Sequence, residues 1–381
     1  MKILIIANYK KGIGGINAQV DLLYTYLNQE DGIKADIFST KGNPIRRCIA
    51  FIKLLCKART YDILHIHACS YWGMVPAVLG IIAGKLWRKR TIITYHGGGA
   101  EEYFDKHATF VRRWLGRADE VIVLSGFLKE IFDQYQIPCV VIPNIVVLRP
   151  QTKRTTTIAP KFISIRHLEP LYNIPCILRA YEQVLKVYPD ATLDILGRGS
   201  QREELEAYVQ ELRLTGVTFV GQVSNQQIYD YLAKADIMLS APKIDNMPVS
   251  LLEAMNAGLL VISSRVGGVP YMINEAIRLE GYKAIRQEKN GKADDTLPNR
   301  PIAQSPNRLI ASLDRQSPIA NRPKKPTGLL FESDNSDDLA EKMIWALEHP
   351  EEVKQIIAQA QIDVQIYAWE NVKQQLMKIY E

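Results

Sequence analysis

The chain has 381 residues with a net charge of +6, and 47% of them are hydrophobic. Two domains of ordinary size are expected, because one hydrophobic core rarely serves so long a chain. The five cysteines are scattered and contain no C-x-x-C pair, which argues against a disulfide framework or a zinc site and favours a reducing cytoplasm.

The sequence contains no segment typical of a leader or a membrane span. The N-terminal MKILIIANY has too short an apolar run for a signal peptide. The longest apolar run, Met74 to Gly84, stops at Lys85 and is well below the roughly 20 residues needed to cross a bilayer. We therefore expect a cytoplasmic protein that is soluble or lies on a membrane surface.

The first part of the chain alternates short β-branched runs with longer amphipathic stretches such as Gln19 to Asn28, which is typical of βαβ units around a parallel sheet. The predicted strands of this part are Lys2 to Ala7, Ala35 to Ser39, Ile63 to His67, Thr91 to Tyr95, Glu120 to Leu124 and Cys139 to Ile142. The first strand is followed by KKGIGGINAQ, where Gly14 and Gly15 allow a ligand close to the backbone and to the start of a helix. A plain tight turn is the alternative.

Residues 45–60, IRRCIAFIKLLCKART, contain five basic side chains and no acid, interleaved with Ile, Phe and Leu. This pattern suits a basic amphipathic helix lying against anionic lipid. The alternative is a helix packed on its own sheet with a solvated basic face. Nucleic acid is not an expected partner, because no nucleic-acid-binding motif accompanies the charge.

Histidines and glycines follow the middle strands of this part. His96 ends a predicted strand and enters the triple glycine of TYHGGGAEEY, so its imidazole is expected to point into a cleft rather than a core. His65 and His67 lie on one face of a strand, where core packing or acceptor-side polarity is favoured over metal binding.

The polar segment Leu148 to Pro160 is interpreted as an interdomain linker. The alternation then restarts, with predicted strands at Lys161 to Ile165, Thr192 to Leu196, Val217 to Val220, Ile237 to Ser240 and Leu259 to Ser263. The expected architecture is α/β, with two tandem doubly wound Rossmann-like domains facing a central cleft. We predict an N-terminal domain at 1–150 and a C-terminal domain at 151–365.

Residues 276–326 interrupt this pattern. They are polar, rich in Pro, Asn, Gln and Arg, and contain the near-repeats NRPIAQSP and ANRPKKP. Such low complexity cannot bury enough apolar surface to offset its ordering entropy, so we predict a disordered insertion. A basic tail that binds a partner or lipid is the alternative.

The stretch IDNMPVSLLEAMNAG places two acids eight positions apart. With Pro248 as the first helical residue and Gly258 just past the helix end, Asp245 falls in the preceding loop and Glu253 within the helix. Both acids could face a ligand; the alternative is capping by Asp245 and a solvated Glu253. The following SSRVGGVPY repeats the strand–glycine pattern, with Gly267 and Gly268 as a second phosphate-binding turn.

Taken together, Asp245-x7-Glu253, EAMNAG, VGGVP and GLLF resemble the donor-site signature of retaining glycosyltransferases of family 4, which have the GT-B fold. The order of GIGG, YHGGG and VIPN extends the resemblance over nearly the whole chain except the insertion. SIRHLEPLYN and DNMPVS further resemble a bacterial subset that works in polysaccharide and envelope assembly.

The resemblance implies a hexosyltransferase that uses a UDP- or GDP-sugar donor and a lipid-linked or glycan acceptor. It further implies that the domain at 1–150 is the acceptor side, that the domain at 151–365 binds the nucleotide-sugar donor, and that a helix at about 366–381 packs back on the first domain. Glu253 would accept hydrogen bonds from the donor ribose, Asp245 from hydroxyls of the sugar, and His96 would contact the sugar. Backbone amides around the sugar would come from Asn246, Met247 and Pro248. The residues implied at the diphosphate are Gly14, Gly15, Arg166, Gly267, Gly268 and Val269.

Two departures from the family pattern bear on activity. Asp245 stands where the family usually has Glu, and Tyr172 stands where a lysine is common. No D-x-D triplet appears where a metal clamp would be expected, so neither a metal nor another cofactor is predicted, and helix N-termini, glycine amides and Arg166 would stabilise the departing diphosphate. The alternatives are a catalytically weak sugar-nucleotide-binding or scaffold protein and a GT-B nucleotide-sugar epimerase; a nicotinamide-dependent dehydrogenase is disfavoured, because no acid follows GIGG at the expected distance.

Overall fold

The computed structural model describes residues 1–11, 15–149, 157–273 and 325–381. Its first sheet has six parallel strands in the order β2-β1-β3-β4-β5-β6. The strands are β1 (Lys2–Ala7), β2 (Lys34–Ser39), β3 (Ile63–Ala68), β4 (Arg90–Tyr95), β5 (Glu120–Val123) and β6 (Val140–Val141).

The second sheet also has six parallel strands, in the order β12-β11-β10-β7-β8-β9. They are β7 (Lys161–Ile165), β8 (Thr192–Leu196), β9 (Val217–Gly221), β10 (Ile237–Ser240), β11 (Leu260–Ser264) and β12 (Leu329–Phe331). The predicted α/β architecture of two doubly wound sheets is confirmed.

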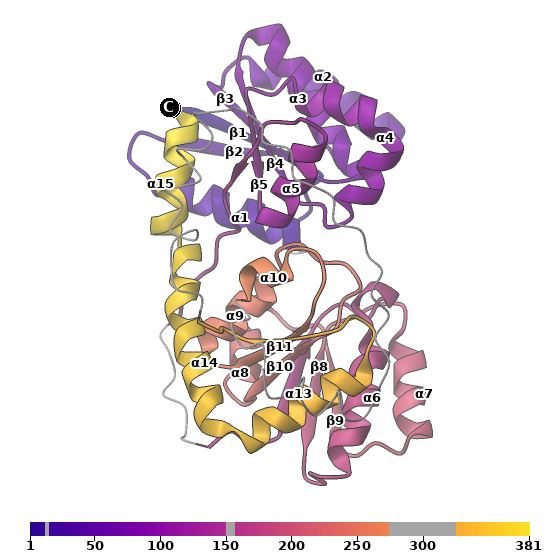
Figure 1. The fold of residues 1–381 in the computed structure, drawn as a ribbon. Coiled ribbons are helices and arrows are strands. Elements are labelled where there is room, and N and C mark those ends of the chain that lie inside the picture. The colour runs from indigo at the N-terminus through magenta and orange to yellow at the C-terminus, as the bar shows by residue number, and fades with distance from the viewer. Residues whose placement is uncertain (12–14, 150–156, 274–324) are drawn as a thin grey trace.

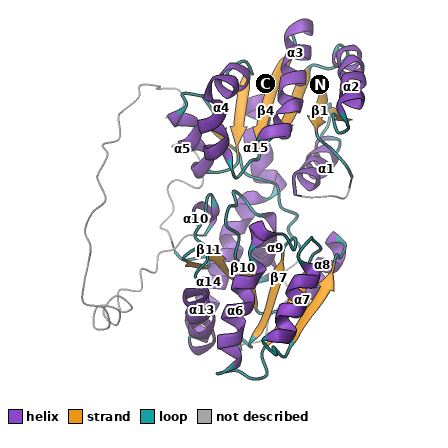
Figure 2. Cartoon of the chain, turned by 90° about the vertical axis from the view of Figure 1, so that its right-hand side faces the viewer, coloured by secondary structure: helices purple, strands orange, loops and turns teal. Residues whose placement is uncertain are grey.

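Helices connect the strands and cover both faces of each sheet (Figures 1 and 2). Those of the first half are α1 (Gly15–Leu27), α2 (Pro44–Ala58), η1 (Tyr71–Met74), α3 (Val75–Trp87), α4 (Ala100–Leu115) and α5 (Gly126–Gln134). Those of the second half are η2 (Pro170–Tyr172), α6 (Ile174–Leu185), α7 (Arg202–Glu211), α8 (Asn225–Leu232), α9 (Val249–Ala257), α10 (Val269–Met272), α13 (Ser336–Glu348), α14 (Pro350–Asp363), η3 (Val364–Tyr367) and α15 (Trp369–Tyr380).

The inner strands form because their side chains are mostly apolar on both faces and are buried by helices on both sides. In β1, Leu4 and Ile6 join the core on one face of the first sheet, whereas Ile3 and Ile5 join the core on the other. Continuous apolar runs of this kind are typical of parallel sheets. They place the polar residues that follow each strand at one edge of the sheet.

The last helix, α15, follows the second half in sequence but packs on the first sheet (Figure 1). It lies beside α1, although the two helices are far apart in the chain. The ring of Trp369 stacks on Tyr26 with centroids 5.1 Å apart, and its indole N–H donates to Glu30 at 2.9 Å. At the C-terminal end, the hydroxyl of Tyr380 lies 2.6 Å from Nδ1 of His65. The chain thus crosses between the two halves a second time.

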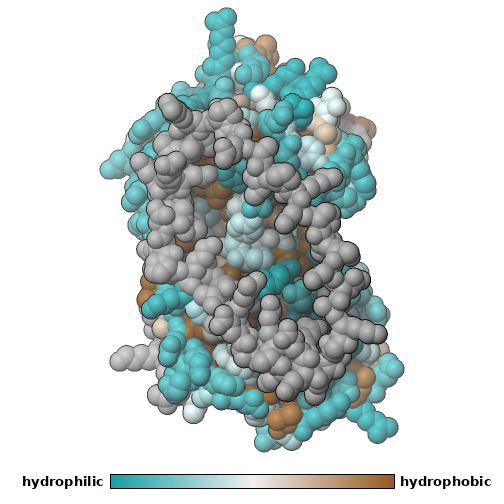
Figure 3. Space-filling view, viewed as in Figure 1, coloured by the Kyte–Doolittle hydropathy of each residue, from teal (hydrophilic) through white to brown (hydrophobic). Residues whose placement is uncertain are grey.

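On the face shown in Figure 3, the residues that are not covered by grey atoms are mostly hydrophilic at the outer edges, with small hydrophobic patches among them. Among the described residues, no helix has the length and apolar character needed to cross a membrane. The predicted insertion at 276–326 falls almost wholly on residues 274–324, which lie outside the described residues, as does part of the predicted linker.

Candidate active site

The site is built from loops that follow the carboxyl ends of four strands. His96 and the three glycines after it follow β4, Arg166 follows β7, and two further loops, 241–248 and 265–268, follow β10 and β11. The triple glycine of the first half reaches the 241–248 loop of the second half, because a Cβ on Gly98 would lie 3.4 Å from the backbone N of Asn246. These loops meet where ligands bind in open α/β sheets.

The double glycine of the second half allows two loops to touch. Gly267 has a φ of +48°, and a Cβ there would lie 1.9 Å from the carbonyl oxygen of Asp245. A Cβ on Gly268 would lie 2.1 Å from the carbonyl oxygen of Asn246. Only glycine fits such a close approach of two backbones.

Hydrogen bonds within these loops decide which backbone N–H groups remain available to a ligand. The N–H of Gly268 donates to the carbonyl of Asp245 at 3.1 Å, and the N–H of Val269 donates to the carbonyl of Val266 at 3.0 Å. Among the described residues nothing accepts from the N–H of Gly267. Gly267 is therefore the amide of this turn that can donate to an anion without breaking an existing hydrogen bond.

Asp245 is held by Arg166. Nη2 of Arg166 lies 3.1 Å from the carboxylate of Asp245, and the two side chains are only 9% and 19% exposed. The same guanidinium donates to Oγ of Ser240 at 2.9 Å and lies 5.6 Å from the ring centre of Tyr172. Tyr172 therefore packs against Arg166 as a neutral side chain. Because Tyr172 stands where a lysine would add a second positive charge, Arg166 is the cation of this part of the described site.

Glu253 lies on α9, four residues after the helix begins. Burial raises the pKa of its carboxyl to about 7, and the nearby charge of Arg149 acts in the opposite direction. The Arg149 guanidinium itself rests on the ring of Tyr229 at 3.9 Å. No hydrogen bond or ion pair from the described part of the chain engages the Glu253 carboxyl, so its acceptor capacity is free for a ligand.

The helix-capping alternative for the two acids is not what the structure shows. Oδ1 of Asp245 accepts from the N–H of Asn246, next to it in the loop, at 2.8 Å rather than from the helix. The prediction that Pro248 is the first helical residue is wrong by one position: Pro248 is the N-cap and α9 begins at Val249. Gly258 does end the helix, with a left-handed φ of 80°.

Residues 246–248 join the two halves. Oγ of Ser125 donates to Oδ1 of Asn246 at 2.5 Å, and Nδ2 of Asn144 donates to the carbonyl of Met247 at 3.1 Å. The prediction that Pro248 presents an amide donor is wrong, because proline has no N–H. Of residues 246–248, Met247 has the backbone N–H that makes no hydrogen bond to any described residue.

His96 lies in a row of three histidine rings. Its Nε2 is 2.8 Å from Nδ1 of His67, whose ring is stacked between those of His96 and His65 with centroids 5.0 Å apart on each side. Burial lowers the pKa of His96 to about 4, so the ring is neutral near pH 7. The contact with His67 leaves Nδ1 of His96 as the ring nitrogen available to a ligand.

The first glycine turn contributes less to the described site. Gly14 lies outside the described residues, and Gly15 is the first residue of α1, where an added Cβ would meet nothing within 4 Å. Sequence reasoning missed Ser125, Asn144 and Tyr271, although VIPN contains Asn144. Tyr271 donates from its hydroxyl to Glu130 of α5 at 2.5 Å, which is a further contact between the halves.

Comparison with known proteins gives consistent matches over both halves. The family model described as Glycosyl transferases group 1 matches residues 150–286, and the model described as Glycosyltransferase Family 4 matches residues 33–149. An uncharacterized glycosyltransferase of Methanocaldococcus jannaschii is 23% identical over 332 residues, which cover 77% of this chain and 86% of that protein.

Two further proteins show similarity in sequence or fold. The alpha-monoglucosyldiacylglycerol synthase of Streptococcus pneumoniae is 25% identical over 253 residues, which cover 59% of this chain and 56% of that protein. The structure of Anabaena HepE in complex with UDP and glucose has a TM-score of 0.71 at 16% identity, and the match covers 100% of this chain and 99% of that one. At this identity the structural likeness shows the fold.

Proposed function

Because this chain belongs to glycosyltransferase family 4 and has the GT-B fold, we propose that it transfers a hexose from a nucleoside diphosphate sugar to a hydroxyl group of a lipid-linked or polysaccharide acceptor. The observation that carries the choice of donor is Glu253, a largely buried carboxyl with unused acceptor capacity, eight residues after an Asp245 that Arg166 holds in place. Retention of the anomeric configuration is proposed from the same donor-site motif.

In the proposed complex, the two acids hold opposite ends of the donor. Glu253 accepts hydrogen bonds from the ribose hydroxyls, and Asp245 accepts from hydroxyls of the transferred sugar. The backbone N–H of Met247 and Nδ1 of His96 also contact this sugar. Arg166, which itself donates to Ser240, holds Asp245 in place before the sugar binds. This supports the role of Asp245, because a fixed acceptor loses little entropy when the sugar arrives.

The departing diphosphate requires positive charge or N–H donors near its oxygens. We assign this role to the N–H of Gly267 and to Arg166, with no metal or other cofactor. Support comes from the free amide of Gly267 and from the absence of a D-x-D triplet at the expected position in the sequence.

We propose that the acceptor is presented at an anionic membrane surface through residues 45–60. In α2, Leu54 and Ala58 pack into the core, whereas Ile45, Ile49 and Ile52 are 72%, 49% and 64% exposed on one side of the helix. Arg46 and Lys53 are exposed on the neighbouring stripe. The name of the pneumococcal relative, a synthase of a glucosyl diacylglycerol, supports a lipid acceptor.

The membrane role is tested with liposomes containing phosphatidylglycerol at low salt. The unaltered protein is expected to bind, and replacement of both Arg46 and Arg47 by Glu is expected to abolish binding. Unchanged binding of the double variant would remove residues 45–60 from the account.

The transferase activity is tested by incubating the protein with a panel of UDP- and GDP-sugars and measuring protection from thermal unfolding and release of the nucleoside diphosphate. At least one donor is expected to raise the melting temperature and to be hydrolysed slowly. Donor binding without turnover on any acceptor would favour the scaffold alternative, for which Tyr172 is the evidence. Conversion of the donor sugar without an acceptor would instead reveal an epimerase.

A further inference from the structure

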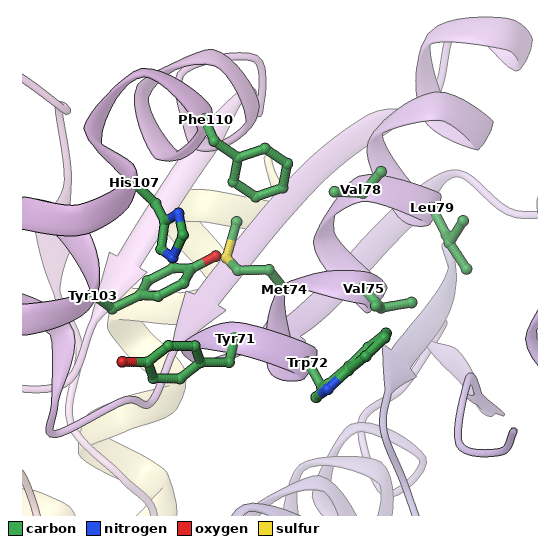
Figure 4. Close-up of a pocket in the computed structure, with 9 residues that line it drawn as sticks. All are labelled: Tyr71, Trp72, Met74, Val75, Val78, Leu79, Tyr103, His107 and Phe110. Carbon is green, nitrogen blue, oxygen red and sulfur yellow. The ribbon is translucent and has the colours of Figure 1, made fainter. Parts of the chain in front are cut away.

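An open pocket of about 510 Å³ lies in the first half of the chain, between η1, α3 and α4 (Figure 4). Its walls are apolar or aromatic and contain no acidic or basic side chain except the imidazole of His107. In Figure 4, His107 and Phe110 of α4 face the valines of α3 across an open space, and Trp72 lies at its lower edge. Phe110 and Trp72 are 40% and 71% exposed, so the apolar lining reaches the surface.

Two walls of this pocket have irregular backbones. Tyr71 has a φ of 54°, a left-handed conformation that costs a non-glycine residue on the order of 1 kcal/mol or more. His107 interrupts α4 with a φ of −134° and a ψ of 27°. The rings of both residues pack on Tyr103, with centroids 4.8 and 4.9 Å away, so aromatic contacts hold both irregularities in place.

The pocket adjoins the glycine loop of the candidate active site. Ser70, which precedes Tyr71, hydrogen-bonds through Oγ to the hydroxyl of Tyr95 at 2.8 Å, and a Cβ on Gly97 would lie 3.0 Å from that Oγ. On the other wall, α4 begins directly after Gly99. Both walls of the pocket therefore continue directly into the glycine loop that follows His96.

A cation with unused donor capacity lies beside Trp72, one of the residues that line the pocket. The guanidinium of Arg47 lies 4.9 Å from the ring centre of Trp72, and its Nε donates to the carbonyl of Gly42 at 2.9 Å. Its Nη1 is buried, and no described residue accepts a hydrogen bond from it. An anion is the ligand that best satisfies such a group, because a guanidinium carries five donors and no acceptor.

We propose that this pocket binds the apolar chain of the acceptor, a lipid phosphate whose anionic group lies near Arg47 and whose hydroxyl end reaches the glycine loop. That the bound lipid is the acceptor rests on the proposed function. That the pocket binds an anionic amphiphile with a single chain rests on the pocket alone. Charge complementarity selects this occupant over a neutral lipid, and a pocket of this volume suits one chain rather than a flat bilayer surface.

The test measures binding of decyl phosphate, below its critical micelle concentration, to the full-length protein by titration calorimetry. Hexyl phosphate and decanol are the matched probes for chain length and charge. Each buried methylene is worth roughly a fourfold change in Kd, so decyl phosphate is expected to bind at least about tenfold tighter than hexyl phosphate. Decanol is expected to bind more weakly than decyl phosphate.

Three variants assign the binding to the pocket. Phe110→Ala is expected to weaken decyl phosphate binding by about tenfold, and Arg47→Gln is expected to abolish the preference for the phosphate over decanol. Leu86→Ala, which truncates a 57% exposed side chain of α3 outside the pocket, is the control and is expected to bind as the unaltered protein does. Thermal melting of each variant verifies that it is folded.

Equal affinities in the unaltered protein and Phe110→Ala, or an equal loss in Leu86→Ala, would overturn the proposal. Binding to phosphatidylglycerol vesicles but not to monomeric decyl phosphate would also overturn it, in favour of a membrane-facing surface. The nucleotide-sugar panel is run on the same samples. If no donor binds while decyl phosphate behaves as expected, the proposed function fails and the pocket assignment stands. If a donor binds but decyl phosphate does not, the pocket assignment fails and the proposed function stands.

Discussion

The guanidinium of Arg166 and the carboxylate of Asp245 form a largely buried ion pair, with Nη2 3.1 Å from Oδ2. The arginine follows a strand and the acid lies in a loop after another strand, so the pair fixes one loop of the site to the edge of the second sheet. The Asp side chain is one methylene shorter than that of the Glu common in this family. Its carboxylate nevertheless reaches the guanidinium of Arg166.

Replacing Asp245 by Asn is expected to lower the free energy of unfolding by about 3 kcal/mol, because it leaves a buried guanidinium without its counter-charge. Sugar transfer is expected to fall by roughly 100-fold through loss of the sugar contact. Urea denaturation and initial rates measure the two effects. Glu206→Gln, which breaks an exposed pair with Arg202 at 2.8 Å, is the control and is expected to cost less than about 1 kcal/mol. Equal losses in the two variants would contradict the structural role of the Arg166–Asp245 pair.

Glu253 is expected to make stability depend on pH. Because its pKa is about 7 in the folded protein and lower in the unfolded chain, the folded state binds more protons between pH 5 and 7, and stability falls as pH rises through this range. Glu253 should account for a loss on the order of 3 kcal/mol in the free energy of unfolding between pH 5 and pH 8. Glu253→Gln should not show this loss, and should therefore be more stable than the unaltered protein at pH 8. Donor affinity should rise in the unaltered protein as the carboxyl ionises.

Urea denaturation at pH 5, 6, 7 and 8 measures this dependence, with Glu203→Gln, an exposed acid on α7, as the control. The control is expected to follow the unaltered protein at each pH. A pH dependence that Glu253→Gln leaves unchanged would show that the carboxyl is ionised at lower pH than the burial of Glu253 implies.

Much of the fold was predictable from the sequence. The strands predicted at Lys161 to Ile165, Thr192 to Leu196 and Ile237 to Ser240 coincide with β7, β8 and β10, because short apolar runs there are bounded by polar residues on both sides. The family and the GT-B fold expected from the motifs are confirmed. β12 was not predicted as a strand, since Leu329–Phe331 is only three residues long.

The site was predictable in its loops but not in its contacts. Glycines and acids at strand ends indicated which loops converge, because all strands of a parallel sheet end at one edge. No sequence pattern indicated that Ser125 would bond to Asn246 across 121 positions, or that Arg166 would bond to Ser240 across 74. The first pairing depends on how the two halves are placed relative to one another, and the second on which strands are neighbours within the second sheet. Local periodicity encodes neither.

His67 is expected to act as a positioning residue for His96. His67→Leu removes the 2.8 Å contact between Nδ1 and Nε2, and should lower kcat by roughly 10- to 100-fold while donor affinity changes less than about twofold. His67→Asn, which keeps a polar atom near the position of Nδ1, should recover part of the loss. Steady-state kinetics and calorimetry separate the two quantities.

The control for this prediction is Tyr380→Phe, which removes the 2.6 Å contact to the neighbouring His65. This variant should lose about 1 kcal/mol of stability and keep its kcat. If His67→Asn proved as slow as His67→Leu, or if neither changed kcat, the contact with His96 would have no catalytic consequence.

Gly267→Ala is expected to separate the two loops of the donor site. A methyl group there would lie 1.9 Å from the carbonyl oxygen of Asp245, so the loop must move and stability should fall by roughly 2–4 kcal/mol. Gly99→Ala is the matched control, because its added Cβ meets nothing within 4 Å, and it should cost less than about 1 kcal/mol. Thermal unfolding of both variants with and without donor measures the difference; similar values would contradict the close approach of the loops.

The central claim is that Glu253 and Asp245 hold opposite ends of one nucleotide sugar. It is tested most directly by calorimetric Kd values for the best donor of the panel and for its parent nucleoside diphosphate, each measured on the unaltered protein, Glu253→Gln and Asp245→Asn. We predict that Glu253→Gln weakens both ligands by the same factor, roughly 10- to 100-fold, and that Asp245→Asn weakens only the nucleotide sugar. Equal effects of Asp245→Asn on the two ligands, or unchanged affinities in Glu253→Gln, would contradict it.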